Sequence, residues 1–210
     1  MIIVHHLENS RSQRVLWMLE ELRLPYEVRR YERDRKTMLA PPELRRIHPL
    51  GKSPVIEDTD DGGRVVAETG AIVEYLVDKA DGRLGPPANR AAALDYRYWL
   101  HYAEGSLMPP LLVTLVLSRV PLFGKAAQKR IRPWIETHLD FVESHLAAHP
   151  WFAGDSLTAA DVMMSFPLEA ARSRGGLDSA RPATIAWLEK VHARPAYQAA
   201  LRAGGPYDYA

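Results

Sequence analysis

The hydrophobic pattern of this 210-residue chain changes near residue 82, and this change limits the fold more than any other feature of the sequence. Before it, short apolar runs of strand length alternate with segments whose apolar residues recur at helical spacing. After DGRLGPPANR, a connector rich in Gly and Pro, the pattern is helical almost throughout. We therefore predict an α/β domain over 1–81, a linker over 82–89 and an all-α helical bundle over 90–210.

The first domain is predicted to run β-α-β, then an irregular or helical stretch, then β-β-α. Its four expected strands are MIIVHHL, PYEVRRY, SPVIED and RVVAE. Apolar residues at helical spacing between residues 15 and 22 predict the first helix, and TGAIVEYLVDKA predicts the second. The order of the elements places a strand-to-helix turn near residue 10 and another near residue 69.

The second domain is predicted to begin with a long helix, AAALDYRYWLHYAEGSLMPPLLVTLVLSRV, that is kinked at Pro109-Pro110 because prolines lack the amide donor. Further helices are expected around 124–148, 158–172, 182–193 and 195–203. In LTAADVMM, Thr158 followed by Asp161 is typical of a capping box, so we assign this pair to folding and not to catalysis.

Composition excludes several functional classes. The 27 Lys and Arg balance the 26 Asp and Glu to a net charge of +1, so we expect no nucleic-acid partner. The chain has no Cys, which excludes disulfides, thiolate metal sites and a cysteine nucleophile, and we predict no metal. No apolar stretch approaches the roughly 20 residues of a membrane span. His5, His6 and Glu8 interrupt any early apolar run, so we expect no signal peptide and a cytoplasmic protein.

Ser10, in the stretch ENSRSQRVLW, has a structural and a chemical interpretation. Ser10 followed by Gln13 fits a capping box, and Ser12 is an alternative cap. A hydroxyl at a strand-to-helix turn is also close to the positive end of a helix dipole, where an anion such as a thiolate is stabilised. A serine hydrolase would need a histidine at Ser10, and at most one of His5 and His6 can face it because strand neighbours alternate.

A second group of polar residues lies in PLGKSPVIED and AETGAI. Thr69 is a good N-cap, but the same helix start would also bind a carboxylate, and Glu68 beside it would accept an ammonium. Together the two residues suit the α-amino acid end of a ligand. Lys52 and Lys36 are candidates for a second carboxylate, although an exposed, solvated lysine is the simpler interpretation of each.

Five motifs carry a resemblance to a known family. They are SRSQRVLWMLEEL, APPELRRIHPLGKSPVI, ETGAI, YAEGSLMPPL and LTAADVMMSFPLEAA, in this order. The chain resembles glutathione transferases over essentially its full length, and most of all a serine-type branch found in bacteria and fungi. The resemblance implies a thioredoxin-like first domain, an all-helical second domain, glutathione as co-substrate, a homodimer and a role in detoxification. Branches that use cysteine at the active-site position do not fit, because the chain has none.

The resemblance also implies a catalytic position. Counted back from Arg14, Ser10 falls where serine-type members hold the hydroxyl that donates to the glutathione thiol. Asn9 and Ser12 stay as alternatives, because branches of the family shift this position by a residue. The implied activity is addition of the thiolate to small hydrophobic electrophiles, with reduction of organic hydroperoxides as a further possibility.

The glutathione-binding residues follow from the same resemblance. Pro54 matches the family's cis-proline, and the backbone of Ser53 then pairs with the cysteinyl residue of glutathione. Glu68 and Thr69 match the pair that holds the γ-glutamyl end. Lys52 would meet the glycyl carboxylate.

The electrophile is expected to contact the kinked helix. Tyr98 and Tyr102 share a helix face, and Met108 and Leu112 continue roughly the same stripe, although such a stripe is more often core than pocket. The resemblance also implies that Glu104 reaches the glutathione of the partner subunit, with a structural or solvated carboxylate as the alternative. A non-catalytic binding or interaction protein of the same fold stays as the second functional hypothesis.

Overall fold

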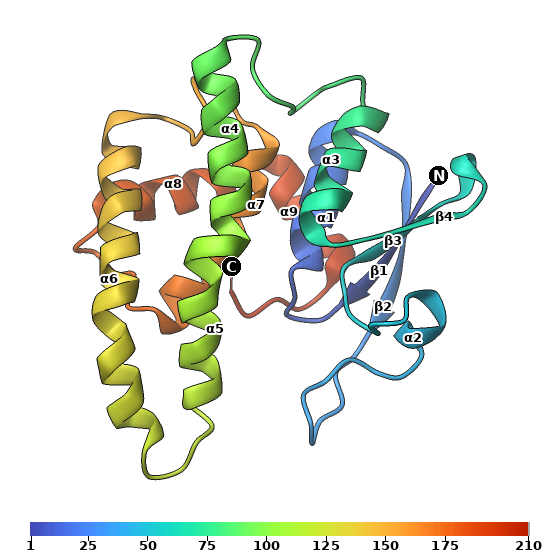
Figure 1. Cartoon of the computed structure of the whole chain (residues 1–210). Coiled ribbons are helices and arrows are strands. Elements are labelled where there is room, and N and C mark those ends of the chain that lie inside the picture. Colours follow the sequence, from blue (N-terminus) through green and yellow to red (C-terminus); the bar gives the residue numbers. More distant parts are fainter. Residues whose placement is uncertain (210) are drawn as a thin grey trace. The chain divides into compact units, whose positions relative to one another are not determined.

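The computed structural model describes residues 1–209, which form two compact units (Figure 1). The first unit consists of Met1–Gly85 and His192–Asp208, and the second consists of Pro86–Val191 with Tyr209. The first contains a mixed sheet with helices, and the second is helical. The predicted fold class, an α/β domain followed by an all-helical one, is thereby confirmed.

The first unit is built on a four-stranded sheet of order β2-β1-β3-β4. Its strands are β1 (Ile2–Leu7), β2 (Tyr26–Tyr31), β3 (Val55–Asp58) and β4 (Arg64–Ala67). Its helices are α1 (Ser12–Leu22), the short α2 (Leu44–Ile47), the 3-10 turn η1 (Thr59–Asp61), α3 (Thr69–Lys79) and α9 (Pro195–Gly204).

The pairing of the strands brings three loops to one end of the sheet. β1 and β2 are parallel, which requires a crossover such as α1, whereas β3 is antiparallel to both β1 and β4. Val55, at the start of β3, pairs with His5 near the end of β1 and with Ala67 at the end of β4. The loop after β1, the loop before β3 and the start of α3 therefore lie beside one another.

The helix α9 packs against α1 in the first unit, although we predicted it within a helical domain over 90–210. Trp17 of α1 and Tyr197 of α9 meet edge to face with ring centroids 5.5 Å apart. Arg194 donates two hydrogen bonds to Glu21, at 2.5 and 2.8 Å. These contacts explain why residues 192–208 lie with the first unit. The amphipathic pattern of α9 predicts a helix but does not identify the surface that it covers.

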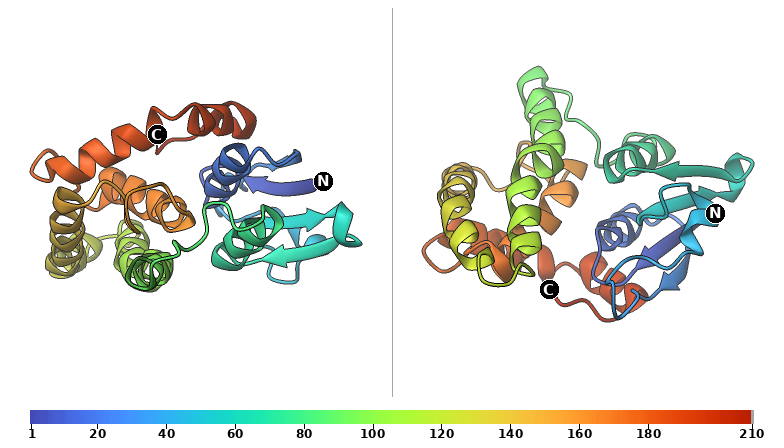
Figure 2. Two further views of the ribbon diagram at one scale, coloured as in Figure 1. Left: turned by 90° about the horizontal axis from the view of Figure 1, so that it is seen from above. Right: turned by 60° about the horizontal axis from the view of Figure 1, so that its bottom comes forward.

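The second unit consists of helices only, among the residues described. They are α4 (Arg90–Tyr102), the π-helical turn η2 (Ala103–Leu107), α5 (Met108–Leu117), α6 (Gly124–Ala148), α7 (Ala159–Arg174) and α8 (Pro182–His192). The first thirteen residues of α7 are all buried, and the helix lies in the middle of this unit (Figure 2). The stretch α4–η2–α5 and the helix α6 run side by side (Figure 1).

The irregularity in the long helix lies one turn earlier than we predicted. We expected a kink at Pro109-Pro110, and the structure has a π-helical turn over Ala103–Leu107 instead. Because neither proline has an N–H, the carbonyls of Gly105 and Ser106, four residues earlier, lose their α-helical donors. A wider turn before the prolines accommodates this loss.

The start of α7 confirms the predicted capping box. The carboxylate of Asp161 accepts hydrogen bonds from the amide and hydroxyl of Thr158, each at 2.9 Å, and from the amide of Phe152 at 3.0 Å. Burial raises the pKa of Asp161 to about 6, while these hydrogen bonds oppose the rise. The pair is thus part of the helix start, as the sequence predicts.

The helical stretch over 90–117 is long and apolar enough to cross a membrane, by length and composition alone. Within its most apolar window, 39% is buried inside the protein. Tyr96, Trp99 and Leu111 are among its buried residues. Core helices of globular proteins meet the same criteria, so the stretch is weak evidence for a membrane span.

Candidate functional site

Ser10 lies in the turn between β1 and α1 and is 6% exposed. Its Oγ accepts a hydrogen bond from the amide of Ser12 at 3.2 Å and lies 2.7 Å from the Oγ of Ser12. The hydroxyl therefore satisfies a donor at the start of α1, but the predicted capping box with Gln13 does not form, because the Gln13 amide donates to the backbone carbonyl of Ser10 and the Gln13 side chain has no hydrogen-bond partner among the described residues. Ser10 is not the N-cap itself, because that position is occupied by Arg11.

Ser12 lies behind Ser10 and is completely buried. Its Oγ is 2.9 Å from the Nδ1 of His6 and 3.3 Å from the amide of Leu7. A chain of hydrogen bonds thus runs from Ser10 through Ser12 to His6. Because of its burial, Ser12 does not present its hydroxyl to a ligand.

His6 ends this chain in its neutral form. Burial, and secondarily the positive charge of Arg30, lower the pKa of His6 from 6.5 to about 4. Sequence reasoning missed this role, because His6 has no motif around it and stands beside a second histidine. The one usable clue was the alternation of side chains along β1, which places His6 and His5 on opposite faces of the sheet.

His5 belongs to a different cluster. Its Nδ1 lies 2.8 Å from the hydroxyl of Tyr31, and its Nε2 lies 2.6 Å from the carboxylate of Glu57. In the part of the chain that the structure describes, neither histidine is hydrogen-bonded to Ser10. The arrangement that a serine hydrolase needs is therefore absent from this turn.

Asn9 uses its side chain to hold the C-terminal tail. Its Nδ2 donates to the carboxylate of Asp208 at 2.6 Å, and its Oδ1 accepts from the amide of Asp208 at 2.9 Å. Asn9 has a φ of +48°, a conformation that Asn tolerates better than most residues. Arg33, which sequence analysis did not identify, donates hydrogen bonds to the backbone oxygens of Glu8 and Asn9 at 3.2 and 3.3 Å. These bonds stabilise the loop between β1 and α1.

The loop before β3 is tied to the end of β1. The Ser53–Pro54 peptide bond is cis, as the resemblance implies, and Pro54 is buried. The hydroxyl of Ser53 donates to the carbonyl of His5 at 2.8 Å and accepts from the amide of Leu7 at 3.2 Å. The hydroxyls of Ser12 and Ser53 thus share the Leu7 amide, which places this loop beside the turn of Ser10. Lys52, one residue earlier, is exposed.

Glu68 and Thr69 form the start of α3 at the same end of the sheet. Thr69 is the first helical residue and is 5% exposed, so it is not the N-cap that we considered. Glu68 occupies the N-cap position, is exposed and has a φ of +71°, which is uncommon for a residue with a Cβ. Its side chain makes no capping hydrogen bond, so the first amides of α3 still need acceptors.

The residues assigned to the electrophile are in the second unit, and they divide into two buried and two exposed side chains. Tyr98 and Tyr102 stack with ring centroids 5.5 Å apart, and the Tyr102 hydroxyl lies 2.5 Å from the Nδ1 of His138 on α6. Tyr102 and Met108 are buried, whereas Tyr98 and Leu112 are 44% and 47% exposed. Burial favours the core interpretation for Tyr102 and Met108.

Two further predicted features concern charged residues. Glu104 lies in the π-helical turn η2 and is half-buried. Among residues 1–209, no group of three or more His, Asp or Glu side chains is arranged to hold a metal ion.

Family models match both units of the chain. The model described as "Glutathione S-transferase, N-terminal domain" matches residues 10–79. The model described as "Glutathione S-transferase, C-terminal domain" matches residues 125–190. The first match covers Ser10, the Ser53–Pro54 bond and the start of α3.

Curated relatives and solved structures agree with these matches. The chain is 39% identical over 211 residues to "Glutathione S-transferase 3" of Schizosaccharomyces pombe, covering 93% of the chain and 85% of that protein. It is 36% identical over 218 residues to "Glutathione S-transferase 1" of Saccharomyces cerevisiae, covering 94% of the chain and 93% of that protein.

Among solved structures, a glutathione S-transferase from Actinobacillus pleuropneumoniae superposes with a TM-score of 0.88 at 33% identity, covering 100% of this chain and 95% of that one. A glutathione transferase from Phanerochaete chrysosporium in complex with oxidized glutathione superposes with a TM-score of 0.80 at 25% identity, covering 96% and 94%. From these identities, which extend over nearly the whole length, the chain belongs to the glutathione S-transferase family.

Proposed function

We propose that this protein is a glutathione transferase of the serine type, in which the Ser10 hydroxyl stabilises the glutathione thiolate. The thiolate then adds to a small hydrophobic electrophile or reduces an organic hydroperoxide. The observation that carries the proposal is the chain of hydrogen bonds from Ser10 through Ser12 to His6. This chain of hydrogen bonds determines whether the hydroxyl proton of Ser10 is free to be donated to the glutathione thiolate.

The proton count along this chain gives the physical reason. A hydroxyl has one proton, so Ser12 donates to only one neighbour. If neutral His6 carries its proton on Nδ1, His6 donates to Ser12, and Ser12 donates to Ser10 at 2.7 Å in preference to the more distant Leu7 carbonyl at 3.3 Å. Ser10 then accepts from Ser12 on both sides, from its amide and its hydroxyl, and keeps its own proton for the thiolate. With the proton of His6 on Nε2, the Ser12 hydroxyl would donate to Nδ1 of His6. The Ser10 hydroxyl would then donate to Ser12 and would have no proton left for the ligand.

Two effects favour the thiolate at this position. A thiol with a pKa of about 8.5 is mostly protonated at neutral pH. Donation from the Ser10 hydroxyl stabilises the anion, and so does the positive end of the α1 dipole one turn away. Both act on the charged form only, so they lower the thiol pKa and raise the concentration of the nucleophile.

The rest of glutathione is assigned to the neighbouring loops. Its cysteinyl backbone pairs with Ser53 beside cis-Pro54. Its γ-glutamyl end is held by Glu68, Thr69 and the uncapped amides of α3, which suit an α-carboxylate. Lys52, exposed at the edge of the same loop, meets the glycyl carboxylate.

The protein is further proposed to act as a cytoplasmic homodimer. In support, α4 and α6 carry large apolar side chains that are about half exposed or more: Leu94 at 64%, Trp134 at 51% and Phe141 at 45%. A second copy is the proposed cover for this surface, and Glu104 is assigned to the glutathione of that copy. Sedimentation velocity is expected to give the mass of a dimer.

Replacement of Ser10 tests the catalytic role. Because Ser10→Ala removes one donor to the developing anion, we expect turnover of chlorodinitrobenzene to fall by about 100-fold or more. The affinity for glutathione, measured by calorimetry, should change little, since the peptide backbone contacts remain. Ser10→Thr keeps the hydroxyl and serves as the matched control.

Three results would contradict this assignment. Loss of turnover in Asn9→Ala with normal turnover in Ser10→Ala would move the catalytic position to Asn9. Equal loss in Ser10→Thr and Ser10→Ala would mean that the hydroxyl is not the active group. Absence of glutathione binding in the unaltered protein would instead favour the non-catalytic interaction protein.

A further inference from the structure

The helices α5 and α6 are joined by a short turn, residues 118–123, whose apolar side chains are exposed to solvent. We call this turn the hairpin tip, because it lies where the two helices of the α5–α6 hairpin meet (Figure 1). Leu122 is 93% exposed, Phe123 is 75% exposed and Val120 is 43% exposed. Among the described residues, Leu122 and Phe123 are the two most exposed of the large apolar ones. The tip therefore presents apolar surface that the chain itself does not cover.

The backbone of the hairpin tip is closed tightly. Leu122 has a φ of +65°, which is uncommon for a bulky residue. The amide of Phe123 donates to the carbonyl of Pro121 at 2.7 Å. A Cβ at Gly124 would collide with the carbonyl of Leu117, so glycine is needed where the chain enters α6. Because folding gains nothing from an exposed leucine in a costly conformation, this geometry favours a functional interpretation.

Positive charge surrounds the tip, and negative charge is missing from its neighbourhood. The stretch 105–135, which contains α5, the tip and the first part of α6, has no Asp or Glu. It has five cations, namely Arg119, Lys125, Lys129, Arg130 and Arg132. Because the whole chain has a formal net charge of only +1, the remaining residues are net negative. The positive charge is thus a local property of this hairpin.

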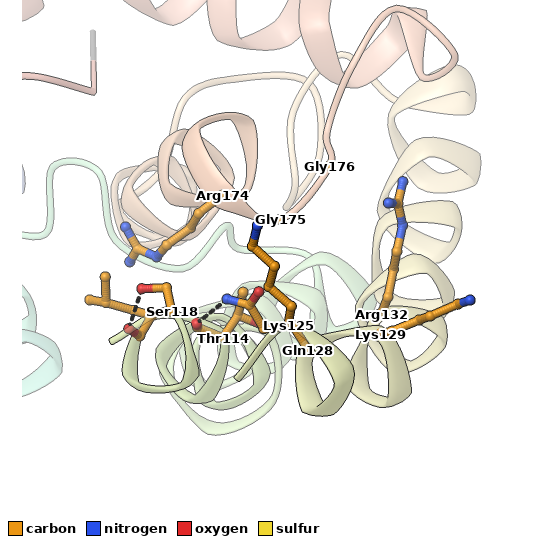
Figure 3. A pocket seen from close by; sticks show the side chains of 10 residues that line it. Thr114, Ser118, Lys125, Gln128, Lys129, Arg132, Arg174, Gly175 and Gly176 are labelled. Carbon is orange, nitrogen blue, oxygen red and sulfur yellow. Dashed lines mark hydrogen bonds between the residues drawn. The ribbon is translucent and has the colours of Figure 1, made fainter. Parts of the chain in front are cut away.

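Most of these cations are not neutralised within the protein. All five are exposed, and Figure 3 shows Lys125, Lys129 and Arg132 extending from α6. Arg132 pairs with Glu136 at 2.9 Å, whereas the other four form no ion pair in the part of the chain that the structure describes. Unpaired cations beside exposed apolar side chains are the combination that binds anionic lipid surfaces.

We propose that the hairpin tip docks onto an anionic lipid bilayer. Leu122 and Phe123 insert between the lipid headgroups, and the surrounding lysines and arginines contact the acidic groups of the lipids. A bilayer suits this surface better than a peptide does, because the apolar residues are on a turn and peptides bind in grooves or along strand edges. The proposal goes beyond the transferase function and does not depend on it.

The contact is peripheral. Two inserted side chains are far fewer than the roughly 20 apolar residues of a membrane span. The helical stretch over 90–117 stays within the folded unit, where Leu111 and other residues of it are buried. The protein is therefore expected to leave the bilayer when the salt concentration is raised, because salt screens the attraction of the cations to the lipids.

Sedimentation with vesicles tests this contact in the full-length protein. We expect binding to vesicles that contain phosphatidylserine to be about tenfold tighter than binding to phosphatidylcholine alone. The tip variant Leu122→Ser/Phe123→Ser should bind the phosphatidylserine vesicles about tenfold more weakly, because the inserted apolar area is lost. The charge variant Arg119→Gln/Lys125→Gln should show a similar loss on these vesicles and none on phosphatidylcholine.

Met38→Ser/Leu39→Ser is the matched control, because it removes two apolar residues of the first unit that are 43% and 66% exposed. Far-UV circular dichroism will verify the fold of each variant. Absence of binding by the unaltered protein, or equal affinity for the two kinds of vesicle, would overturn the proposal. Unchanged binding of the tip variant, or an equal loss in the control, would overturn it as well. Binding to polyglutamate without binding to vesicles would replace the lipid by an acidic protein.

Discussion

The turn of Ser10 and the helix α5 of the second unit both contain buried hydroxyl groups, but these groups have opposite hydrogen-bonding surroundings. At the turn, Ser12 has partners on every side, namely Ser10, His6 and Leu7. On α5, the hydroxyl of Thr114 has no partner among residues 1–209. The first arrangement fixes the direction of a proton within the protein, whereas the second leaves one buried hydroxyl unsatisfied.

This difference predicts how each region responds to substitution. Removing a hydroxyl from a satisfied network leaves other groups without partners, and this destabilises the fold. Removing one that was never satisfied takes away a cost. The same chemical change should therefore have opposite signs in the two regions.

The largest expected effect is a pH dependence that comes from His6. Its pKa is about 4 when folded and 6.5 in the reference state, so the unfolded chain binds more protons between these values. The contribution of His6 to stability is complete above pH 6.5 and is lost as the pH falls toward 4, by about 3 kcal/mol in total.

Urea unfolding at neutral pH and at about pH 5 measures this loss. The comparison protein is His6→Gln, which has no titrating group at this position and should lose less stability over the same interval. Burial also lowers the pKa values of His138 and His145, so part of the pH dependence will remain in the variant. An identical loss in both proteins would show that His6 is not coupled to folding in this way.

Ser12→Ala should affect both stability and catalysis. We expect a loss of about 2 kcal/mol in the free energy of unfolding, because the Nδ1 of His6 loses its partner. Turnover should fall about tenfold with little change in the KM for glutathione, because Ser10 loses the donor that directs its proton. Stopped-flow or steady-state kinetics with chlorodinitrobenzene separates turnover from KM.

Ser53→Ala is the control for Ser12→Ala. The Ser53 hydroxyl also accepts from the Leu7 amide, but it is not part of the hydrogen-bond chain from Ser10 to His6. Equal kinetics in both variants would refute a specific role of Ser12.

Thr114→Val should have the smallest effect and the opposite sign. It keeps the shape of the side chain and removes only the hydroxyl that has no partner, so we expect the ligand-free protein to gain about 1 kcal/mol in stability. Thermal or urea unfolding will detect this gain, and Ser118→Ala is the control because the Ser118 hydroxyl is already paired. A clear destabilisation by Thr114→Val would mean that the hydroxyl has a partner within the protein.

The same contrast explains what the sequence was able to predict. The strands, most helices and the turn of Ser10 can be predicted from local patterns, because apolar periodicity and capping residues are recognisable within short segments of sequence. The position of Ser53–Pro54 beside Ser10 needs only the pairing of β1 with β3. His6, in contrast, gains its role from its burial and from its hydrogen bond to Ser12, and neither can be read from the residues beside it in the sequence.

Other features depend on contacts between segments that are distant in sequence. A cavity between the ends of α5, α6 and α7 is lined by residues from 114–132 and 174–176 (Figure 3), so no single sequence motif identifies it. The packing of α9 on α1 depends on the meeting of Trp17 with Tyr197, which are 180 positions apart in the printed sequence. The helix irregularity lies at Ala103–Leu107 because the carbonyls that lose their donors are four residues before the prolines, and we placed the kink at the prolines themselves.

The measurement that tests the central claim most directly is the pKa of the glutathione thiol when it is bound. Ultraviolet absorbance of the thiolate, followed against pH, gives this value for the unaltered protein and for Ser10→Ala. The account predicts a bound pKa well below the free value of about 8.5 in the unaltered protein, and a return toward that value in Ser10→Ala. The same lowered pKa in both proteins would contradict the role of the Ser10 hydroxyl.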